Sequence, residues 1–130
     1  MLNISEASSI ALHSMIYLAN RGQKAHSLKE ISEAFKVSPN HLSKVLQRLV
    51  KSGLLVSIKG PSGGFQIKKG KERATLLEVY EAVEGKYLKK ACLFAAPKKC
   101  RTCVMKPMLN EINSAFETFM KKHRLNDLKL

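Results

Sequence analysis

The sequence contains no tryptophan, few other aromatic residues and no long run of apolar residues. Charged residues interrupt its longest apolar stretches every few positions, so no segment has the length of a membrane-spanning helix. The N-terminal segment MLNISEASSI carries a glutamate and several serines where a secretory signal peptide has a positively charged end and an apolar run. We therefore expect a cytoplasmic protein that neither spans nor binds a membrane.

Acidic residues are also scarce. Ten aspartates and glutamates stand against 23 lysines and arginines, which gives a formal net charge of +13. Such a chain binds polyanions because its lysines and arginines displace condensed counterions. Double-stranded DNA is the partner that we expect. An anionic membrane surface is the weaker alternative, because the sequence has neither a basic amphipathic helix nor a lipidation signal.

Cysteine is a third scarce residue, and the three that occur, Cys92, Cys100 and Cys103, lie close together. An odd number of cysteines in a chain without an export signal argues against a disulfide framework. Metal, cluster or redox chemistry remains open. Cys100 and Cys103 have the spacing of half a zinc-ribbon site, but the other half is missing. No histidine and aspartate are arranged with the cysteines as in an enzyme, so we expect no catalytic activity.

The chain has 130 residues, of which 45% are hydrophobic, and this is enough for one domain with its own core. Apolar residues recur at helical spacing over residues 3–20, beginning with Ile4, and again after Pro107. The second stripe is wide for a helix at the end of so small a domain, so we expect it to pair with a second copy of the chain. Packing on the chain's own core is the alternative. The stripe consists of Met108, Leu109, Ile112, Ala115, Phe116, Phe119 and Met120.

Two more helices are predicted between residues 27 and 52. Ser27, with Glu30 three positions later, has the spacing of a capping box. Ser38 followed by Pro39 is typical of a helix start. The connector between the two helices is short, and the second helix has a polar, basic outer face, as in a helix-turn-helix motif.

Residues 54–69, LLVSIKGPSGGFQIKK, contain two short apolar strands around a glycine-rich turn and predict a β-hairpin. A basic hairpin that directly follows a helix-turn-helix motif is a wing. Thr75 with Glu78 forms a second capping box and predicts a helix that stops at Gly85. The predicted fold class is therefore mainly α with a small β-hairpin wing, that is, a winged helix-turn-helix followed by a long C-terminal dimerisation helix.

Basic residues are concentrated in this region, since residues 27–69 contain eight lysines and arginines and only two glutamates. In the major groove we expect Asn40 and His41 to reach base edges, while side chains farther along the helix hold phosphates. Backbone contacts are expected from the preceding helix start and from the wing. An ordinary solvated surface is the alternative. The expected DNA-binding residues are Ser27, Lys29, Pro39, Asn40, His41, Ser43, Lys44, Arg48, Lys59, Ser62, Gly63 and Gly64.

The run SLKEISEAFKVSPNHLSKVLQRLVKSGLLVSIKGPSGGF, residues 27–65, resembles the DNA-binding region of the Rrf2 family of winged-helix transcription regulators. Its GPSGGF turn is the most specific element, and the likeness extends over nearly the whole chain. The resemblance implies a homodimer on a palindromic operator. It also divides the chain into a DNA-binding domain (1–85), a cysteine-containing sensor loop (86–104) and a dimerisation helix with its tail (105–130).

The resemblance further implies that Cys92, Cys100 and Cys103 bind an iron–sulfur cluster, of the 2Fe-2S or the 4Fe-4S type, although their spacing departs from the family's usual one. It suggests His13 as a fourth ligand, with a structural histidine as the alternative. Such a cluster would let the regulator sense redox state, nitric oxide or iron–sulfur status. A thiol switch, a zinc site, inert thiols and a DNA-binding protein without a sensor are the other possibilities.

Overall fold

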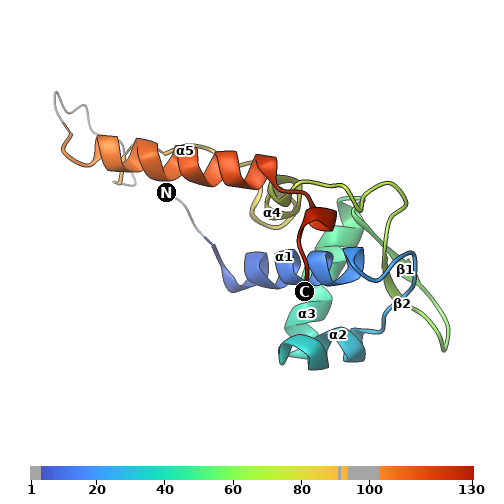
Figure 1. Ribbon diagram of the computed structural model, residues 1–130. Coiled ribbons are helices and arrows are strands. Elements are labelled where there is room, and N and C mark those ends of the chain that lie inside the picture. Colours follow the sequence, from blue (N-terminus) through green and yellow to red (C-terminus); the bar gives the residue numbers. More distant parts are fainter. Residues whose placement is uncertain (1–3, 91, 94–102) are drawn as a thin grey trace.

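A computed structural model describes residues 4–90, 92–93 and 103–130 of the chain (Figure 1). The described part is mainly helical and has one two-stranded antiparallel sheet, which confirms the predicted fold class. None of its helices has the length and apolar character needed to cross a membrane. The elements are α1 (Glu6–Ala19), α2 (Leu28–Phe35), α3 (Pro39–Lys51), β1 (Leu55–Ile58), β2 (Gly64–Ile67), α4 (Leu76–Glu84), α5 (Lys106–Lys122) and a short 3-10 helix, η1 (Leu125–Asp127).

The first helix begins later than its apolar pattern predicts. Ser5 is its N-cap, and the Ser5 hydroxyl accepts a hydrogen bond from the N–H of Ser8 at 3.1 Å. Capping serines satisfy N–H groups that have no partner within the helix, so they define where a helix starts. Ile4, which the pattern assigns to the buried face, lies before the cap and is 58% exposed.

The two capping boxes have different outcomes. Thr75 and Glu78 form the predicted box at the start of α4. At the start of α2, Ser27 accepts from the N–H of Glu30 at 3.1 Å, as predicted, but Glu30 does not reach back. Its carboxylate instead lies 2.7 Å from Nδ1 of His26. The prediction of a capping box at Ser27 is wrong because the imidazole takes the carboxylate that would have closed it.

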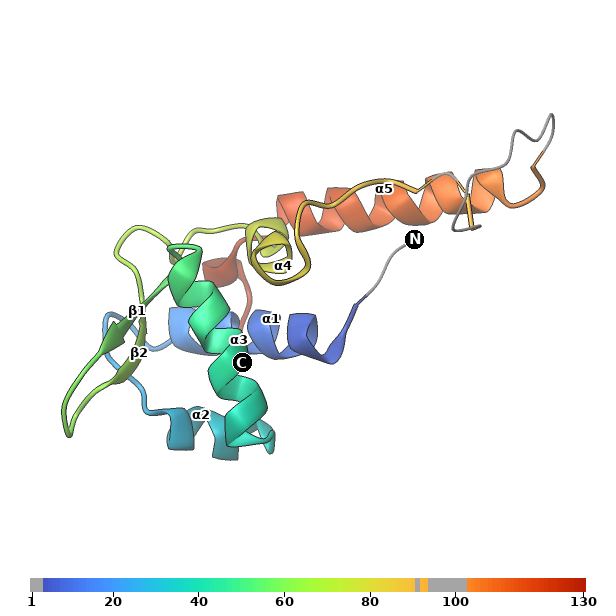
Figure 2. The same ribbon diagram turned by 180° about the vertical axis from the view of Figure 1, so that it is seen from behind.

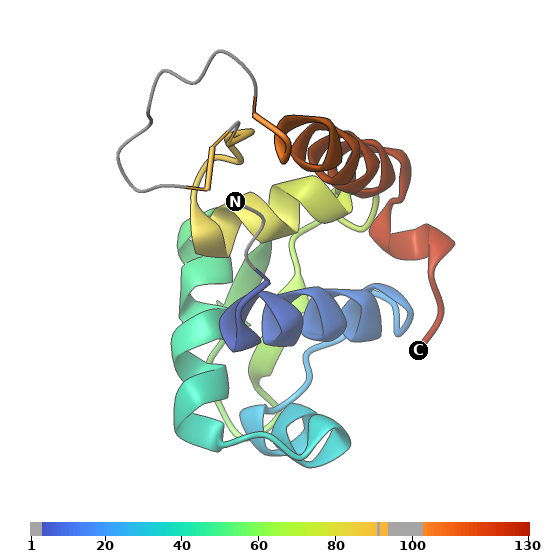
Figure 3. The same ribbon diagram turned by 90° about the vertical axis from the view of Figure 1, so that its left-hand side faces the viewer.

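The core lies where α1, α2, α3, α4 and the hairpin meet. Figure 3 shows α4, in yellow, between α1, in blue, and α5, in red-brown. Burying a large apolar side chain stabilises the fold by about 1.5–3 kcal/mol. The most deeply buried side chains are Met15, Leu18, Ile31, Leu42, Leu46, Leu49, Leu55, Ile67, Val79 and Leu125.

The predicted apolar stripe of α5 divides between two environments. Leu109 and Met120 are buried, and Phe116 packs against the core. Four other members, Met108, Ile112, Ala115 and Phe119, are exposed. The N-terminal half of α5 extends beyond the rest of the molecule (Figures 1 and 2). Packing on the chain's own core, the alternative, thus accounts for part of the stripe, and pairing of the exposed part with a second copy stays a prediction.

The β1–β2 hairpin is attached to the chain segment before α2. His26 and Phe65 form a bridge in which each N–H donates to the other residue's carbonyl, at 2.9 and 2.8 Å. Gly64, at the start of β2, has φ +147°, and a Cβ at this position would lie 2.1 Å from the carbonyl oxygen of His26. Only glycine allows this approach, so the hairpin is held close to α2.

Replacing Gly64 with alanine is expected to lower the free energy of unfolding by about 3–4 kcal/mol, because the new Cβ displaces the His26 bridge in addition to straining the backbone. Gly60→Ala is the matched control, since Gly60 also has positive φ (+105°) but no atom lies within 4 Å of its added Cβ. The control should cost about 1–3 kcal/mol. Denaturant unfolding followed by circular dichroism measures both. Equal losses would contradict the role given to the bridge.

Candidate nucleic-acid interface and cysteine segment

Half of the residues predicted to contact DNA lie on α3. The helix buries Leu42, Val45, Leu46 and Leu49, and this orientation leaves Asn40 and Lys44 exposed. Ser38 caps the helix and Pro39 occupies its first turn. Proline suits this position because its missing N–H would have no partner within the helix.

The turn between α2 and α3 is short because α2 ends in a left-handed residue, Lys36, with φ 53°. In Figures 1 and 2, α2, the N-terminal half of α3 and the β1–β2 hairpin all lie on the side of the molecule opposite α5. We call these three elements the recognition surface. Its exposed residues include two predicted backbone contacts, Ser27 and Lys29, at the start of α2.

His41, a predicted base-reading residue in the first turn of α3, faces the start of α1. Its Nδ1 is 3.9 Å from a carboxylate oxygen of Glu6, and its side chain is 37% exposed. Ser43, two residues farther along the helix, is also only partly exposed. His41 therefore remains accessible at the start of α3, beside an acidic group that the sequence pattern did not pair with it.

The tip of the hairpin exposes Lys59 and Ser62. The N–H of Gly63 donates to the carbonyl of Gly60 at 3.0 Å, and a Cβ on Gly63 would lie 2.1 Å from the carbonyl oxygen of Ile58. Gly63 thus serves to close the turn. Its amide is engaged within the turn, while the side chains of Lys59 and Ser62 are exposed for a contact with DNA.

Arg48, a predicted phosphate contact, makes a contact within the chain. Its Nη1 donates to the carbonyl of Val83 in the last turn of α4, at 3.4 Å. Arg48 lies in the C-terminal half of α3, away from Asn40, and remains exposed. The structure therefore brings Arg48 to α4, and the sequence pattern gave no sign of this contact.

The cysteine segment is described in part. Cys92 and Cys103 are free thiols, and both are partly exposed. Cys100 lies outside the described residues. Among the residues that are described, no three histidines, cysteines or acids come together as a metal site.

His13, the predicted fourth ligand, is on α1 with its ring edge against Phe35 of α2. Its Nδ1 lies 2.7 Å from the carbonyl oxygen of Ser9. None of the contacts that the described residues make with His13 involves Cys92 or Cys103. The ligand role of His13 stays a prediction.

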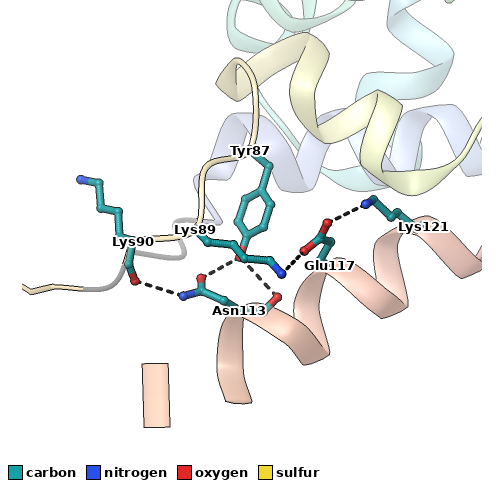
Figure 4. A network of polar contacts seen from close by, with 6 residues as sticks. All are labelled: Tyr87, Lys89, Lys90, Asn113, Glu117 and Lys121. Carbon is teal, nitrogen blue, oxygen red and sulfur yellow. Dashed lines mark hydrogen bonds and ion pairs between the residues drawn. The ribbon is translucent and has the colours of Figure 1, made fainter. Parts of the chain in front are cut away.

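A polar network attaches the start of the cysteine segment to α5 (Figure 4). The Tyr87 hydroxyl donates to Oδ1 of Asn113 at 2.7 Å, and Nδ2 of Asn113 donates to the carbonyl of Lys90 at 3.1 Å. Burial, with the negative charge of Glu117, raises the pKa of Tyr87, so this hydroxyl keeps its proton at neutral pH. Asn113 is only 4% exposed. Asn113 is not among the predicted functional residues, although a polar residue at helical spacing between Leu109 and Phe116 signals a buried hydrogen-bonding site.

Glu117 forms the second part of this network. Its carboxylate forms ion pairs with two lysines. The Nζ of Lys121, on the same helix, lies 2.5 Å from one carboxylate oxygen, and the Nζ of Lys89, in the segment before Cys92, lies 2.7 Å from the other. The hydrogen bonds from Lys121 and then from Lys89 lower the pKa of Glu117 from 4.5 to about 2. The same ion pair raises the pKa of Lys89. Residues 87–90 are therefore held on α5 by both neutral and charged groups.

Comparison with known proteins gives one consistent result. Residues 4–129 match the family model described as "Rrf2: Iron-dependent Transcriptional regulator". The chain is 30% identical to a protein of Aquifex aeolicus described as an HTH-type transcriptional regulator, over 95% of this chain and 89% of that protein. It is 28% identical to the regulator NsrR of Shouchella clausii, over 99% of this chain and 89% of the relative. The solved structure of CymR, the global cysteine regulator of B. subtilis, superposes with a TM-score of 0.79 at 24% identity, covering 98% and 95% of the two chains.

The Glu117 network gives a prediction for acid titration. A carboxylate whose pKa is lowered stabilises the folded form above its unfolded pKa of 4.5, and this contribution is lost as the pH falls through about 2. In a carboxyl NMR titration Glu117 should titrate at about 2 in the native protein. It should move toward the ordinary value of 4.5 in the variant Lys89→Ala/Lys121→Ala. Lys122→Ala is the control on the same helix. An unchanged midpoint in the double variant would contradict the network.

Proposed function

The chain belongs to the Rrf2 family of transcriptional regulators, and from this premise we propose that it binds a two-fold symmetric DNA operator as a homodimer. The observation that carries the proposal is the recognition surface itself. The N-terminal half of α3, with the exposed Asn40 and Lys44, and a hairpin that exposes Lys59 both lie on the side opposite α5. This arrangement suits a helix in the major groove with a wing on the flanking backbone.

In this proposal the start of α3 enters the major groove. Asn40 and His41 contact base edges, since the first residues of a recognition helix reach deepest. Phosphates that flank the major groove are contacted by lysine and serine side chains of α2, α3 and the wing. These contacts position the protein on the duplex without reading its sequence. The phosphate contacts are Ser27, Lys29, Ser43, Lys44, Lys59 and Ser62.

We place the dimer contact on α5. The side chains of Met108, Ile112, Ala115 and Phe119 recur at helical spacing and leave an exposed apolar face on a helix that extends beyond the rest of the chain. A second copy of the same helix is the natural partner for such a face, because a two-fold contact pairs identical surfaces. Two recognition surfaces would then reach half-sites about one helical turn apart.

The proposed sensor is the cysteine segment. Cys92, Cys100 and Cys103 would hold an iron–sulfur cluster through thiolates, the soft ligands that such clusters require, with His13 as the proposed fourth ligand. The iron dependence in the description of the matching family model supports this assignment. A cluster would supply one-electron redox chemistry to the site. The chain itself contributes the attachment of residues 87–90 to α5, so that the ligand segment and the proposed dimer helix move together.

A thiol switch is the second candidate for the sensor. It is favoured by the free, partly exposed thiols of Cys92 and Cys103. The similarity of the fold to CymR, the global cysteine regulator of B. subtilis, also favours it. A switch of this kind needs two thiols that can meet and an oxidant, but no metal. Zinc remains a third option for the same thiolates, and a regulator without a sensor is the fourth.

Two substitutions on α3 separate base contacts from phosphate contacts. Asn40→Ala should reduce discrimination at one base pair by about 1–3 kcal/mol and leave binding to random DNA unchanged. Lys44→Ala should weaken binding to all duplexes and reduce the slope of log affinity against log salt by about one unit. Fluorescence anisotropy over a range of salt concentrations measures both effects. Equal effects of the two variants on specific and random DNA would refute this assignment.

Charge placed on the exposed face of α5 should separate the proposed dimer. We expect Ile112→Glu/Phe119→Glu to sediment as a monomer and to bind a palindromic duplex no more tightly than a single half-site, because buried carboxylates without partners are costly. Ser114→Glu adds one carboxylate on the other side of α5 and should remain dimeric. A double variant that still sediments as a dimer would remove α5 from the interface.

Protein purified without oxygen should show a broad absorption band at about 400 nm, with iron and acid-labile sulfide in stoichiometric amounts. Changing Cys92, Cys100 and Cys103 to alanine should abolish the band and the response of DNA affinity to oxidation, while leaving the fold and general DNA binding intact. His13→Ala should retain less iron. A colourless, iron-free protein that resists reconstitution would reject the cluster and favour the thiol switch or zinc.

A further inference from the structure

The C-terminal end of α4 lies against both α1 and α3, and one carboxylate lies where the three helices meet. Glu84, the last residue of α4, accepts hydrogen bonds from the hydroxyls of Ser5 and Ser8 at the start of α1. Ser8 has no exposed surface, and Glu84 is only partly exposed. Because the carboxylate belongs to α4 and both hydroxyl donors belong to the start of α1, these hydrogen bonds fix the position of α4 relative to α1.

The electrostatics of this site favour the charged form of Glu84. The hydrogen bonds from Ser5 and then from Ser8 lower the pKa of Glu84, against the opposing effect of burial, and the positive charge of Arg48 lowers it further. Glu84 is therefore a carboxylate at neutral pH. The negative charge lies at the C-terminal end of α4, where the carbonyl groups already concentrate negative charge, so a cation at this point is stabilising.

Arg48 is that cation. Its guanidinium donates to the carbonyl of Val83, one residue before Glu84, at 3.4 Å. It thus reaches from α3 to an otherwise unsatisfied carbonyl at the end of α4. The guanidinium that the sequence pattern assigns to a phosphate thus already contacts a carbonyl at the end of α4, and its charge acts on Glu84 without a direct ion pair among the described contacts.

We propose that Arg48 and Glu84 are positioning residues for DNA recognition, and that Arg48 is not a phosphate ligand. This inference rests on the proposed function. Arg48 is eight residues beyond Asn40 on the same helix, a rise of about 12 Å, so a tilt of about 10° around Arg48 displaces Asn40 by about 2 Å. A displacement of this size breaks a bidentate contact with a base. The contact with α4 therefore sets whether the start of α3 can read sequence.

The test compares Arg48→Gln, Glu84→Gln and the double variant. The probes are the tightest-binding duplex that the native protein recovers from a random-sequence pool and a scrambled duplex of the same composition, each titrated over a range of salt. We expect each single variant to lose about tenfold in discrimination between the two duplexes, with the salt slope unchanged, since no phosphate contact is removed. The double variant should lose less than the sum of the two single variants, because both changes act on the same junction at the C-terminal end of α4.

A different pattern would overturn the inference. If Arg48→Gln lowers the salt slope on both duplexes by about one unit while Glu84→Gln binds like the native protein, Arg48 is a phosphate contact. Lys51→Gln removes the same charge from the exposed last turn of α3 and should keep full discrimination. If Glu84→Gln does not fold, Ser5→Ala, which removes one of the two hydroxyl donors, must show the loss of discrimination instead. A native protein that binds neither duplex would refute the proposed function and this inference together.

Discussion

The burial of α4 is the constraint on which the rest of the molecule depends. One side of this short helix places Leu76 and Val79 in the core that α1 and α3 share. Its neighbour Tyr80 extends toward α5, where its ring meets the edge of Phe116 at a centroid distance of 5.1 Å. The helices α3 and α5 have little direct contact with each other. Because both pack against α4, this helix fixes their relative position.

This arrangement assigns different tasks to the two ends of the molecule. The recognition surface carries exposed lysines and the start of α3, and the opposite side carries the apolar face of α5. The segment that leads to Cys92 leaves α4 at Gly85 and is then held on α5 through Tyr87 and Lys89. The segment that carries Cys92 is thus joined directly to the end of α4, which Arg48 of α3 contacts from the other side.

Local patterns predicted the helix starts well, because a cap involves residues only a few positions apart. Ser38 with Pro39, and Thr75 with Glu78, needed no knowledge of the tertiary fold. The hairpin was equally visible, since its apolar alternation and its glycine-rich turn are local. The helix-turn-helix motif could likewise be identified from local features, namely the short connector, the polar outer face of the second helix and the hairpin that follows.

The errors and omissions arose where a side chain has a partner far away in the sequence or outside the pattern considered. Glu30 has the spacing of a capping box but binds His26. The contact of Arg48 with Val83 was not predicted, and neither was that of Asn113, which joins α5 to a residue 26 positions earlier. A contact such as that between Arg48 and Val83 carries no period in the sequence, so only the structure reveals it.

The most direct test of the account is the selection of DNA from a random-sequence pool by the native protein. A homodimer that inserts α3 into two major grooves predicts an enriched inverted repeat, with its half-sites about one helical turn apart. Bases contacted by Asn40 should be the most strongly selected within each half. Enrichment of a single unrepeated site, or no enrichment above composition, would contradict the proposed dimeric recognition of an operator.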